Sequence, residues 1–303
     1  MSINKSTGAY LPSNLRLWAL PWIVLGLIIT NILSPDLGSP QMTMLAAVAI
    51  VLVGIPHGTL DVEIASIRFG RSSYSDKFKI LAGYFSCAAI MTLCWLTNSA
   101  LALTLFLVIS IIHFGQDWRG GADIFLAMMV SWALIALPAL SHPEEVINIF
   151  VMLTDAEAGS TISAILACTA APAALGSLAF TYWAYKNGET LNAVDVASCL
   201  TAALFLPPLI AFAVFFCGLH SPRHMEESLR ECSGLSAAKK AGVMAAVFPL
   251  AIALGVLLFI GMDNLQLESG VIRSAFILIS ILTVPHFILE HFKLNRATST
   301  KYA

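Results

Sequence analysis

The chain has few charged residues. Asp, Glu, Lys and Arg together make up 11% of its 303 residues, whereas 58% of it is hydrophobic. The mean hydropathy of +0.84 exceeds what the core of a water-soluble domain requires. The uncharged runs are long enough to cross about 30 Å of hydrocarbon, which takes about 20 helical residues. The composition predicts an all-α, polytopic membrane protein with a single helical domain over residues 1–303, including a polar N-terminal tail, 1–16, and a basic C-terminal tail, 293–303.

The sequence also lacks the patterns typical of several other functions. Its net charge is −2 and its Lys and Arg residues are scattered, which argues against nucleic-acid binding. None of the six cysteines belongs to a Cys-x-x-Cys motif, and all but Cys232 lie within apolar runs. The cysteines therefore indicate packing residues rather than disulfides or a metal site.

Several apolar runs are candidate membrane spans, and turns or prolines separate them. Thr97-Asn98-Ser99 divides one long uncharged stretch in two, and Pro56-His57-Gly58 ends another. The candidate spans are Leu17 to Leu33, Met42 to Ile55, the two halves of Ile80 to Gln116, Ile124 to Leu140, Ser160 to Tyr185, Val196 to Leu219, Ala241 to Met262 and Ser274 to Phe292.

The basic residues conflict with a simple count of these spans. Lys and Arg are enriched in cytoplasmic loops, which places Lys5, Arg16 and the Arg68 to Lys79 segment inside. Counting each later run as one crossing would put the basic Arg223 to Lys240 segment outside. We therefore expect a re-entrant segment or a hidden crossing, with Pro172 and Pro207-Pro208 as the places where a helix can break. The expected protein has eight to ten segments, both termini in the cytoplasm, and a location in the inner or plasma membrane.

Six of the seven histidines lie near the ends of apolar runs. An ionisable group costs roughly 2.5 to 3.5 kcal/mol at a bilayer centre, so such groups usually serve a function. Three of these histidines precede an acid by four residues, in the pairs His57/Asp61, His113/Asp117 and His286/Glu290.

Four histidines are candidates for one metal site: His57, His113, His220 and His224. Neutral imidazole suits iron, copper, zinc and nickel, and its second nitrogen commonly donates to a carboxylate. Asp61 and Asp117 are candidates for that carboxylate role, each serving a neighbour's imidazole rather than its own. His286 fits either a further ligand or a packing residue. Beside the histidine pair, Ser221 is expected to cap a new helix that starts at Pro222.

Two segments resemble a known family: Gly54-Ile55-Pro56-His57-Gly58-Thr59-Leu60-Asp61 and His113-Phe114-Gly115-Gln116-Asp117. Together with His220, His224 and Pro285-His286, they resemble the Brp/Blh family of integral membrane β-carotene cleavage dioxygenases over roughly residues 50 to 292. The resemblance implies an Fe(II) enzyme that adds O2 across the central double bond of β-carotene and gives two retinal molecules, usually for a rhodopsin. It also implies that His57, His113, His220 and His224 are the iron ligands.

A carotenoid substrate would already be dissolved in the membrane and could enter laterally along aromatic side chains. The candidates for this contact are Phe106, Phe114, Trp118, Phe212, Phe215 and Phe216.

Two other classes of function remain open. A di-iron membrane desaturase or hydroxylase needs about eight ligands, more than the seven histidines present. A proton-coupled transporter could use His/Asp relays at helix breaks, but the chain has no paired halves. One bound iron per chain would favour the dioxygenase, two the desaturase, and none the transporter.

Overall fold

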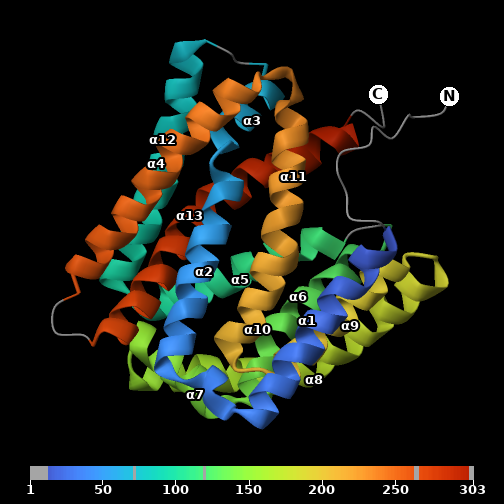
Figure 1. The fold of residues 1–303 in the computed structure, drawn as a ribbon. Coiled ribbons are helices and arrows are strands. Elements are labelled where there is room, and N and C mark those ends of the chain that lie inside the picture. The colour runs from blue at the N-terminus through green and yellow to red at the C-terminus, as the bar shows by residue number, and fades with distance from the viewer. Residues whose placement is uncertain (1–12, 71–72, 119–120, 263–265, 300–303) are drawn as a thin grey trace.

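The computed structural model describes residues 13–70, 73–118, 121–262 and 266–299, excepting the side chains at 13–18, 35 and 291–299. Within these residues every regular element is helical (Figure 1), which confirms the all-α prediction. Lys5, the side chains of Arg16 and His291, and the side chains of the basic C-terminal stretch lie outside the described part.

Most of the apolar runs form the helices expected of them. The helices are α1 (Ser13–Leu33), α2 (Pro40–Gly58), α3 (Asp61–Arg68), α4 (Tyr74–Thr97), α5 (Ser99–Phe114), α6 (Ile124–Ser141), α7 (Pro143–Leu153), α8 (Ala156–Lys186), α9 (Thr190–Phe205), α10 (Pro208–Phe215), α11 (Ser221–Glu231), α12 (Ala237–Ile260) and α13 (Leu267–Ser299). Four short turns join some of them: the 3-10 turns η1 (Pro35–Gly38), η2 (Gly115–Trp118) and η4 (Cys232–Gly234), and the π turn η3 (Phe216–His220). The backbone of α13 is helical to Ser299, so this helix continues into the stretch expected as a C-terminal tail.

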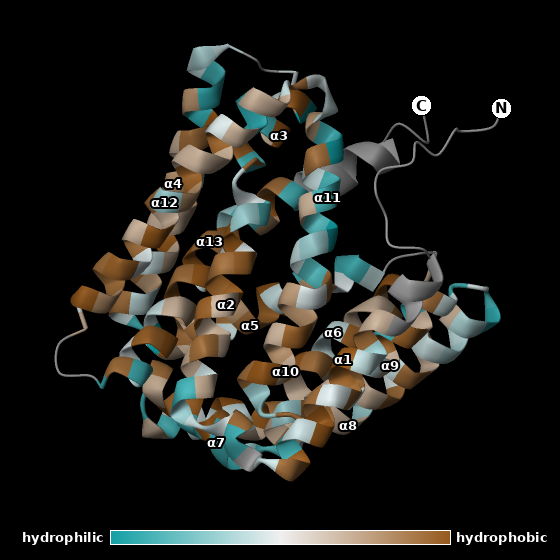
Figure 2. Cartoon of the chain, in the orientation of Figure 1, coloured by the Kyte–Doolittle hydropathy of each residue, from teal (hydrophilic) through white to brown (hydrophobic). Residues whose placement is uncertain are grey.

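Among the described residues, seven helical segments are long and apolar enough to cross a membrane. α1 and α9 contain shorter apolar stretches, Ala19–Leu33 and Thr190–Phe205. α4 and α12 expose large apolar side chains such as Phe85, Leu93 and Leu257, which suits contact with lipid. Figure 2 shows hydrophilic residues gathered on α3 and α11 at one end and on α7 at the other, with apolar helices between. The chain is a multi-pass helical membrane protein, while the total of eight to ten segments and the cytoplasmic termini stay predictions.

The chain reverses direction inside Val196 to Leu219, which the sequence suggested as one span. α9 ends at Phe205, Leu206 and Pro207 are extended, and α10 begins at Pro208. Figure 1 shows α10 rising from the end of the molecule at which α9 arrives. This reversal lies at the predicted Pro207-Pro208 break, whereas α8 continues through Pro172 without ending. A proline inside a membrane helix is tolerated where neighbouring groups satisfy the freed carbonyl.

Because of this reversal, α11 and α3 end on the same side of the molecule. The Arg68 guanidinium at the end of α3 pairs with the Glu231 carboxylate at the end of α11, with Nε and Oε2 2.8 Å apart. The Lys239 ammonium lies 3.8 Å from the Glu63 carboxylate of α3. The Arg223 to Lys240 segment therefore shares a side with Arg68, as the distribution of basic residues predicted. Which compartment this side faces stays a prediction.

Candidate metal centre

Five histidines from distant parts of the chain meet in one buried group, the histidine cluster: His57, His113, His220, His224 and His286. His57 lies in the last turn of α2, His113 in the last turn of α5, and His286 within α13. His220 ends the π turn η3, and His224 follows in the first turn of α11. None of the five is more than 8% exposed.

Four of the rings form a closed loop. The centroids are 5.3 Å apart for His57 and His220, 5.0 Å for His220 and His113, 5.1 Å for His113 and His286, and 5.0 Å for His286 and His57. His224 lies beside this loop, 4.4 Å from the His220 ring. The structure thus brings the four predicted ligands together and places His286 beside them, while their binding of a metal stays a prediction.

The donor atoms of the cluster are spaced for a metal ion. Three groups have ligand atoms all within 4.8 Å of one another: His57, His113 and His286; His113, His220 and His224; and His224, His286 and Glu290. Two ligands on opposite sides of an ion lie about 4 Å apart, because a metal–imidazole bond is about 2.0 to 2.1 Å long. Small side-chain movements would therefore bring these atoms to coordination distance.

Two aspartates contact imidazoles, but neither contacts the histidine four residues before it. Asp117 accepts from His220 Nδ1 at 2.8 Å and from His224 Nε2 at 3.0 Å. Asp61 accepts from His286 Nδ1, with its oxygens 2.9 and 3.0 Å away. The contacts agree with the prediction that these acids would meet a neighbour's ring.

Glu290 is a third carboxylate in the cluster, and it was not among the predicted site residues. Its Oε1 accepts from His224 Nδ1 at 3.0 Å, and its Oε2 lies 3.2 Å from His113 Nδ1. The sequence signal for it was present, since Glu290 follows His286 by four residues as Asp61 follows His57. His224, whose two nitrogens both face carboxylates, can offset at most one of the three carboxylate charges, so the largely buried site keeps a net negative charge. Such burial is costly unless a cation compensates it.

The unpaired nitrogens also fit a metal. Among the described residues, the buried Nε2 atoms of His220 and His286 have no hydrogen-bond partner, although their Nδ1 atoms are bonded to carboxylates. Buried polar atoms are nearly always paired, so these nitrogens are available to an ion. His224 differs, because both of its nitrogens contact carboxylates. It could bind an ion only by exchanging one of these contacts.

Ser221 does not cap a helix, so that prediction was wrong. Its backbone is helical (φ −61°, ψ −42°), because the π turn carries the helix from α10 into α11 without a break. The Ser221 hydroxyl instead donates to the Val53 carbonyl of α2 at 2.6 Å and lies 3.3 Å from His57 Nδ1. π turns occur frequently at functional sites. Here the turn leads directly to two histidines of the cluster.

The glycine of the Gly54-Ile55-Pro56-His57 motif permits a close helix contact. A Cβ atom on Gly54 would overlap Cε1 of the Phe216 ring, which is buried. The Phe216 ring in turn stacks on His220, with centroids 5.2 Å apart. Only glycine at position 54 therefore allows α2 to approach this ring without displacing it.

The six predicted aromatic residues lie near the cluster or lead away from it. The ring centroids of Phe114 and Phe215 lie 4.7 and 5.9 Å from the centroid of the His220 ring. The Trp118 ring stacks on Phe215, with centroids 6.2 Å apart. The Phe212 ring stacks on Phe216, with centroids 5.3 Å apart. Phe106 and Phe212 line an apolar cavity. His142 takes no part in the cluster, and its Nδ1 contacts Ser141 at 2.9 Å.

A polar cavity adjoins the cluster on the side of α3 and α11. It is small and is lined in part by Asp61, His224, His286 and Glu290. Glu227 and Glu231 of α11 also line it. Because these residues are acidic or imidazole side chains, the cavity is suited to water or cations rather than to an apolar molecule.

Comparisons with known proteins agree with these observations. A family model described as beta-carotene 15,15′-dioxygenase matches residues 48–292. A curated protein named beta-carotene 15,15′-dioxygenase, from an uncultured marine bacterium (66A03), is 29% identical over 266 residues, which cover 82% of this chain and 92% of the relative. No solved structure matches the chain. The matched region contains all five histidines of the cluster, and the chain belongs to the β-carotene 15,15′-dioxygenase family.

Proposed function

We propose that this protein is an iron-dependent dioxygenase that cleaves the central double bond of β-carotene and gives two molecules of retinal. The observation that carries the proposal is the cluster of five buried imidazoles and three carboxylates at one end of an apolar helix bundle. The family and the named relative support an oxidoreductase acting on carotene. In the proposed reaction the central C=C bond breaks, and each of its carbons receives one oxygen atom of O2.

His57, His113, His220 and His224 would hold the iron, and His286 would complete the donor set. Imidazole is a suitable ligand for Fe(II), and neutral ligands leave the charge of the ion to be balanced by the surrounding carboxylates. Bound there, Fe(II) would supply the electrons that activate O2. His224 would bind after exchanging one of its contacts with Asp117 or Glu290 for the ion.

Asp61 and Asp117 would act as positioning residues, and Glu290 would act with them. Their acceptor oxygens fix the ring orientation and tautomer of His286 and His220, and the ring orientation of His224. Such contacts raise the basicity of the imidazole, and losing one typically weakens metal affinity or activity about 10- to 100-fold.

The substrate would come from the membrane, because β-carotene is an apolar hydrocarbon. Phe114, Phe215 and Phe216 beside His220 offer it an apolar, water-excluding surface. Phe106, Phe212 and Trp118 extend that surface away from the cluster. The protein would then lie in the inner or plasma membrane, from where retinal can pass to a rhodopsin.

Expression in bacteria that make β-carotene tests the reaction class. We expect the orange colour to fade and retinal to appear, with about one iron in each purified chain. The His113→Ala variant should keep the colour and bind no iron, and His142→Ala should behave as the wild type because His142 lies outside the cluster. Unchanged β-carotene in cells that hold folded, iron-loaded wild-type protein would refute the proposal.

A further inference from the structure

The polar cavity beside the histidine cluster extends toward the hydrophilic end of the molecule. Residues of α3, α11 and α13 line it, and Figure 2 shows hydrophilic residues gathered on α3 and α11 at this end. The cavity has room for about one water molecule, which suits a small ion and excludes an organic ligand. Its lining joins residues of the metal centre, His224, His286 and Glu290, to three charged residues outside it, Arg68, Glu227 and Glu231.

Three side chains that can bind a cation follow one face of α11. Glu227 and Glu231 stand three and seven residues after His224, a spacing that places all three on the same side of a helix. At a rise of roughly 1.5 Å per residue, Glu227 lies about 4.5 Å and Glu231 about 10 Å from His224 along the helix. Carboxylates are suitable ligands for divalent cations. An ion can therefore pass from one carboxylate to the next on its way to the histidines.

The inner end of the cavity carries a nitrogen that is available to an ion. His286 lines the cavity and is 6% exposed. In the described part of the chain its Nε2 atom has no hydrogen-bond partner, and this atom lies 3.9 Å from Oε1 of Glu290. Together with His224, these two residues form a group whose ligand atoms all lie within 4.8 Å of one another. The cavity thus ends at donor atoms that are spaced for a cation.

An arginine closes the outer end of the cavity. Arg68 donates from Nε and Nη2 to the two carboxylate oxygens of Glu231, at 2.8 and 2.9 Å, and from Nη1 to the Leu289 carbonyl at 3.0 Å. Its guanidinium therefore joins the three helices that line the cavity. The side chains of Arg68 and Glu231 are 18% and 22% exposed, which places the pair between the interior and the surface. Because the guanidinium is positive and occupies Glu231, it opposes the entry of a cation.

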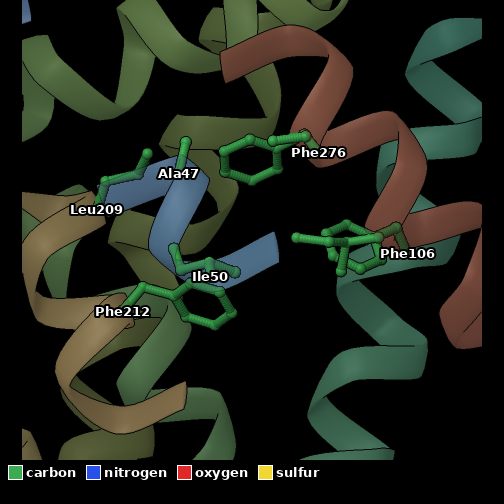
Figure 3. A pocket seen from close by; sticks show the side chains of 8 residues that line it. Ala47, Ile50, Phe106, Leu209, Phe212 and Phe276 are labelled. Atoms are coloured by element: carbon green, nitrogen blue, oxygen red, sulfur yellow. The ribbon is translucent and has the colours of Figure 1, made fainter. Parts of the chain in front are cut away.

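The apolar cavity offers an ion no comparable path. It lies between α2, α5, α10 and α13, and the residues that line it have apolar side chains, among them Phe106, Phe212 and Phe276 (Figure 3). A cation there would lose its water without gaining a ligand, which is costly. Of the two cavities described, only the polar one suits the passage of an ion to the metal centre.

We propose that Fe(II) enters the metal centre through the polar cavity, with Glu227 and Glu231 binding it in transit and Arg68 controlling the entrance. The ion first replaces Arg68 at Glu231, then binds Glu227, and then reaches the imidazoles at the inner end. These steps exchange ligands only, so the iron stays Fe(II) throughout. The identity of the ion rests on the proposed function, whereas the route rests on the cavity and the residues that line it.

The rate of iron uptake by the full-length protein tests this route. The protein is freed of iron by a chelator, mixed with Fe(II) in detergent under anaerobic conditions, and separated from unbound Fe(II) by rapid gel filtration before its iron is measured. Glu227→Gln removes a ligand along the route, and Arg68→Gln removes the guanidinium from the entrance. Glu226→Gln is the matched control, because Glu226 precedes Glu227 on α11 and pairs with Arg230 outside the cavity lining.

We expect Glu227→Gln to slow the initial uptake roughly three- to tenfold and Arg68→Gln to speed it by a similar factor, because one loses an attractive charge and the other a repulsive one. Glu226→Gln should keep the wild-type rate, and all three variants should reach the wild-type iron content at saturating Fe(II). Glu227→Gln leaves the pair of Arg68 and Glu231 in place, so its result decides the route even where Arg68→Gln fails to fold.

Three outcomes would overturn the inference: a wild-type uptake rate in Glu227→Gln, equal slowing in Glu226→Gln, or slower uptake in a folded Arg68→Gln protein. Wild-type protein that takes up no Fe(II) would overturn it as well. Protein that takes up Fe(II) with the expected differences in rate but leaves β-carotene intact would instead refute the proposed function, and the route would stand.

Discussion

Replacing Asp117 by Asn tests how a carboxylate serves two rings of the cluster at once. The Asp117 side chain is 3% exposed and accepts from His220 Nδ1 at 2.8 Å and from His224 Nε2 at 3.0 Å. Asn keeps the shape but has one oxygen and no charge. It can accept from one ring only, and it turns an N–H group toward the other.

The expected magnitude follows from these two contacts. A hydrogen bond to a charged group contributes about 1.5 to 3 kcal/mol and a neutral one about 0.5 to 1.5 kcal/mol. Neutralising one contact removes about 1 to 1.5 kcal/mol and losing the other about 1.5 to 3 kcal/mol, so together they weaken iron binding by about 2.5 to 4.5 kcal/mol, or roughly 70- to 2,000-fold. The lost negative charge acts in the same direction, because it had favoured a cation.

Iron titration by equilibrium dialysis of the metal-free protein in detergent measures this effect. Glu63→Gln is a matched control, since Glu63 is a partly buried carboxylate that pairs with Lys77 at the same end of the molecule. We expect Glu63→Gln to keep wild-type iron affinity. Wild-type affinity and turnover in a folded Asp117→Asn protein would show that Asp117 serves only to end a helix, and the reasoning from its two contacts would be refuted.

Three further predictions concern other parts of the structure. His286→Ala should lose most of its bound iron while the protein still inserts into the membrane, and full iron content would reduce His286 to a packing residue. Gly54→Ala should lower turnover and thermal stability because its Cβ would overlap the buried Phe216 ring; wild-type values for both would mean that the ring relaxes freely. A cysteine at Arg230, in an otherwise cysteine-free protein, should be labelled only after the cells are permeabilised, whereas a cysteine at Glu157 should be labelled in intact cells; the reverse pattern would invert the orientation.

Much of the site could be predicted because the pattern that indicates each residue lies within a few positions of it in the sequence. The isolated histidines stand out in apolar surroundings, and the spacing of His113 and Asp117 marks a pair on one helix face. The distribution of basic residues also predicted a re-entrant segment or a hidden crossing, with Pro207-Pro208 as one possible break, and the structure has a reversal there. These inferences needed only composition, spacing and the chemistry of imidazole.

The pairing between helices could not be predicted, because it depends on tertiary packing. Nothing in the spacing indicates that Asp61 meets His286 across 225 positions, or that Ser221 bonds to Val53 instead of capping a helix. The inclusion of Glu290 similarly depends on how α13 lies against α11. Pro172 failed as a predicted break for the same reason, since the packing of α8 decides whether a proline ends it.

The ends of α2 and α5 have a consequence for the field at the metal centre. Both helices finish within two residues of a cluster histidine, and the carboxyl end of a helix carries about half a negative charge. The main chain thus adds to the negative potential of the three carboxylates. The helix ends and the carboxylates together attract a cation to the site before any imidazole binds it. A bound cation would relieve repulsion between groups that the fold forces together, so we expect metal loading to raise the melting temperature of the protein. The ion would then stabilise the fold, by offsetting its buried negative charge, as well as take part in the reaction.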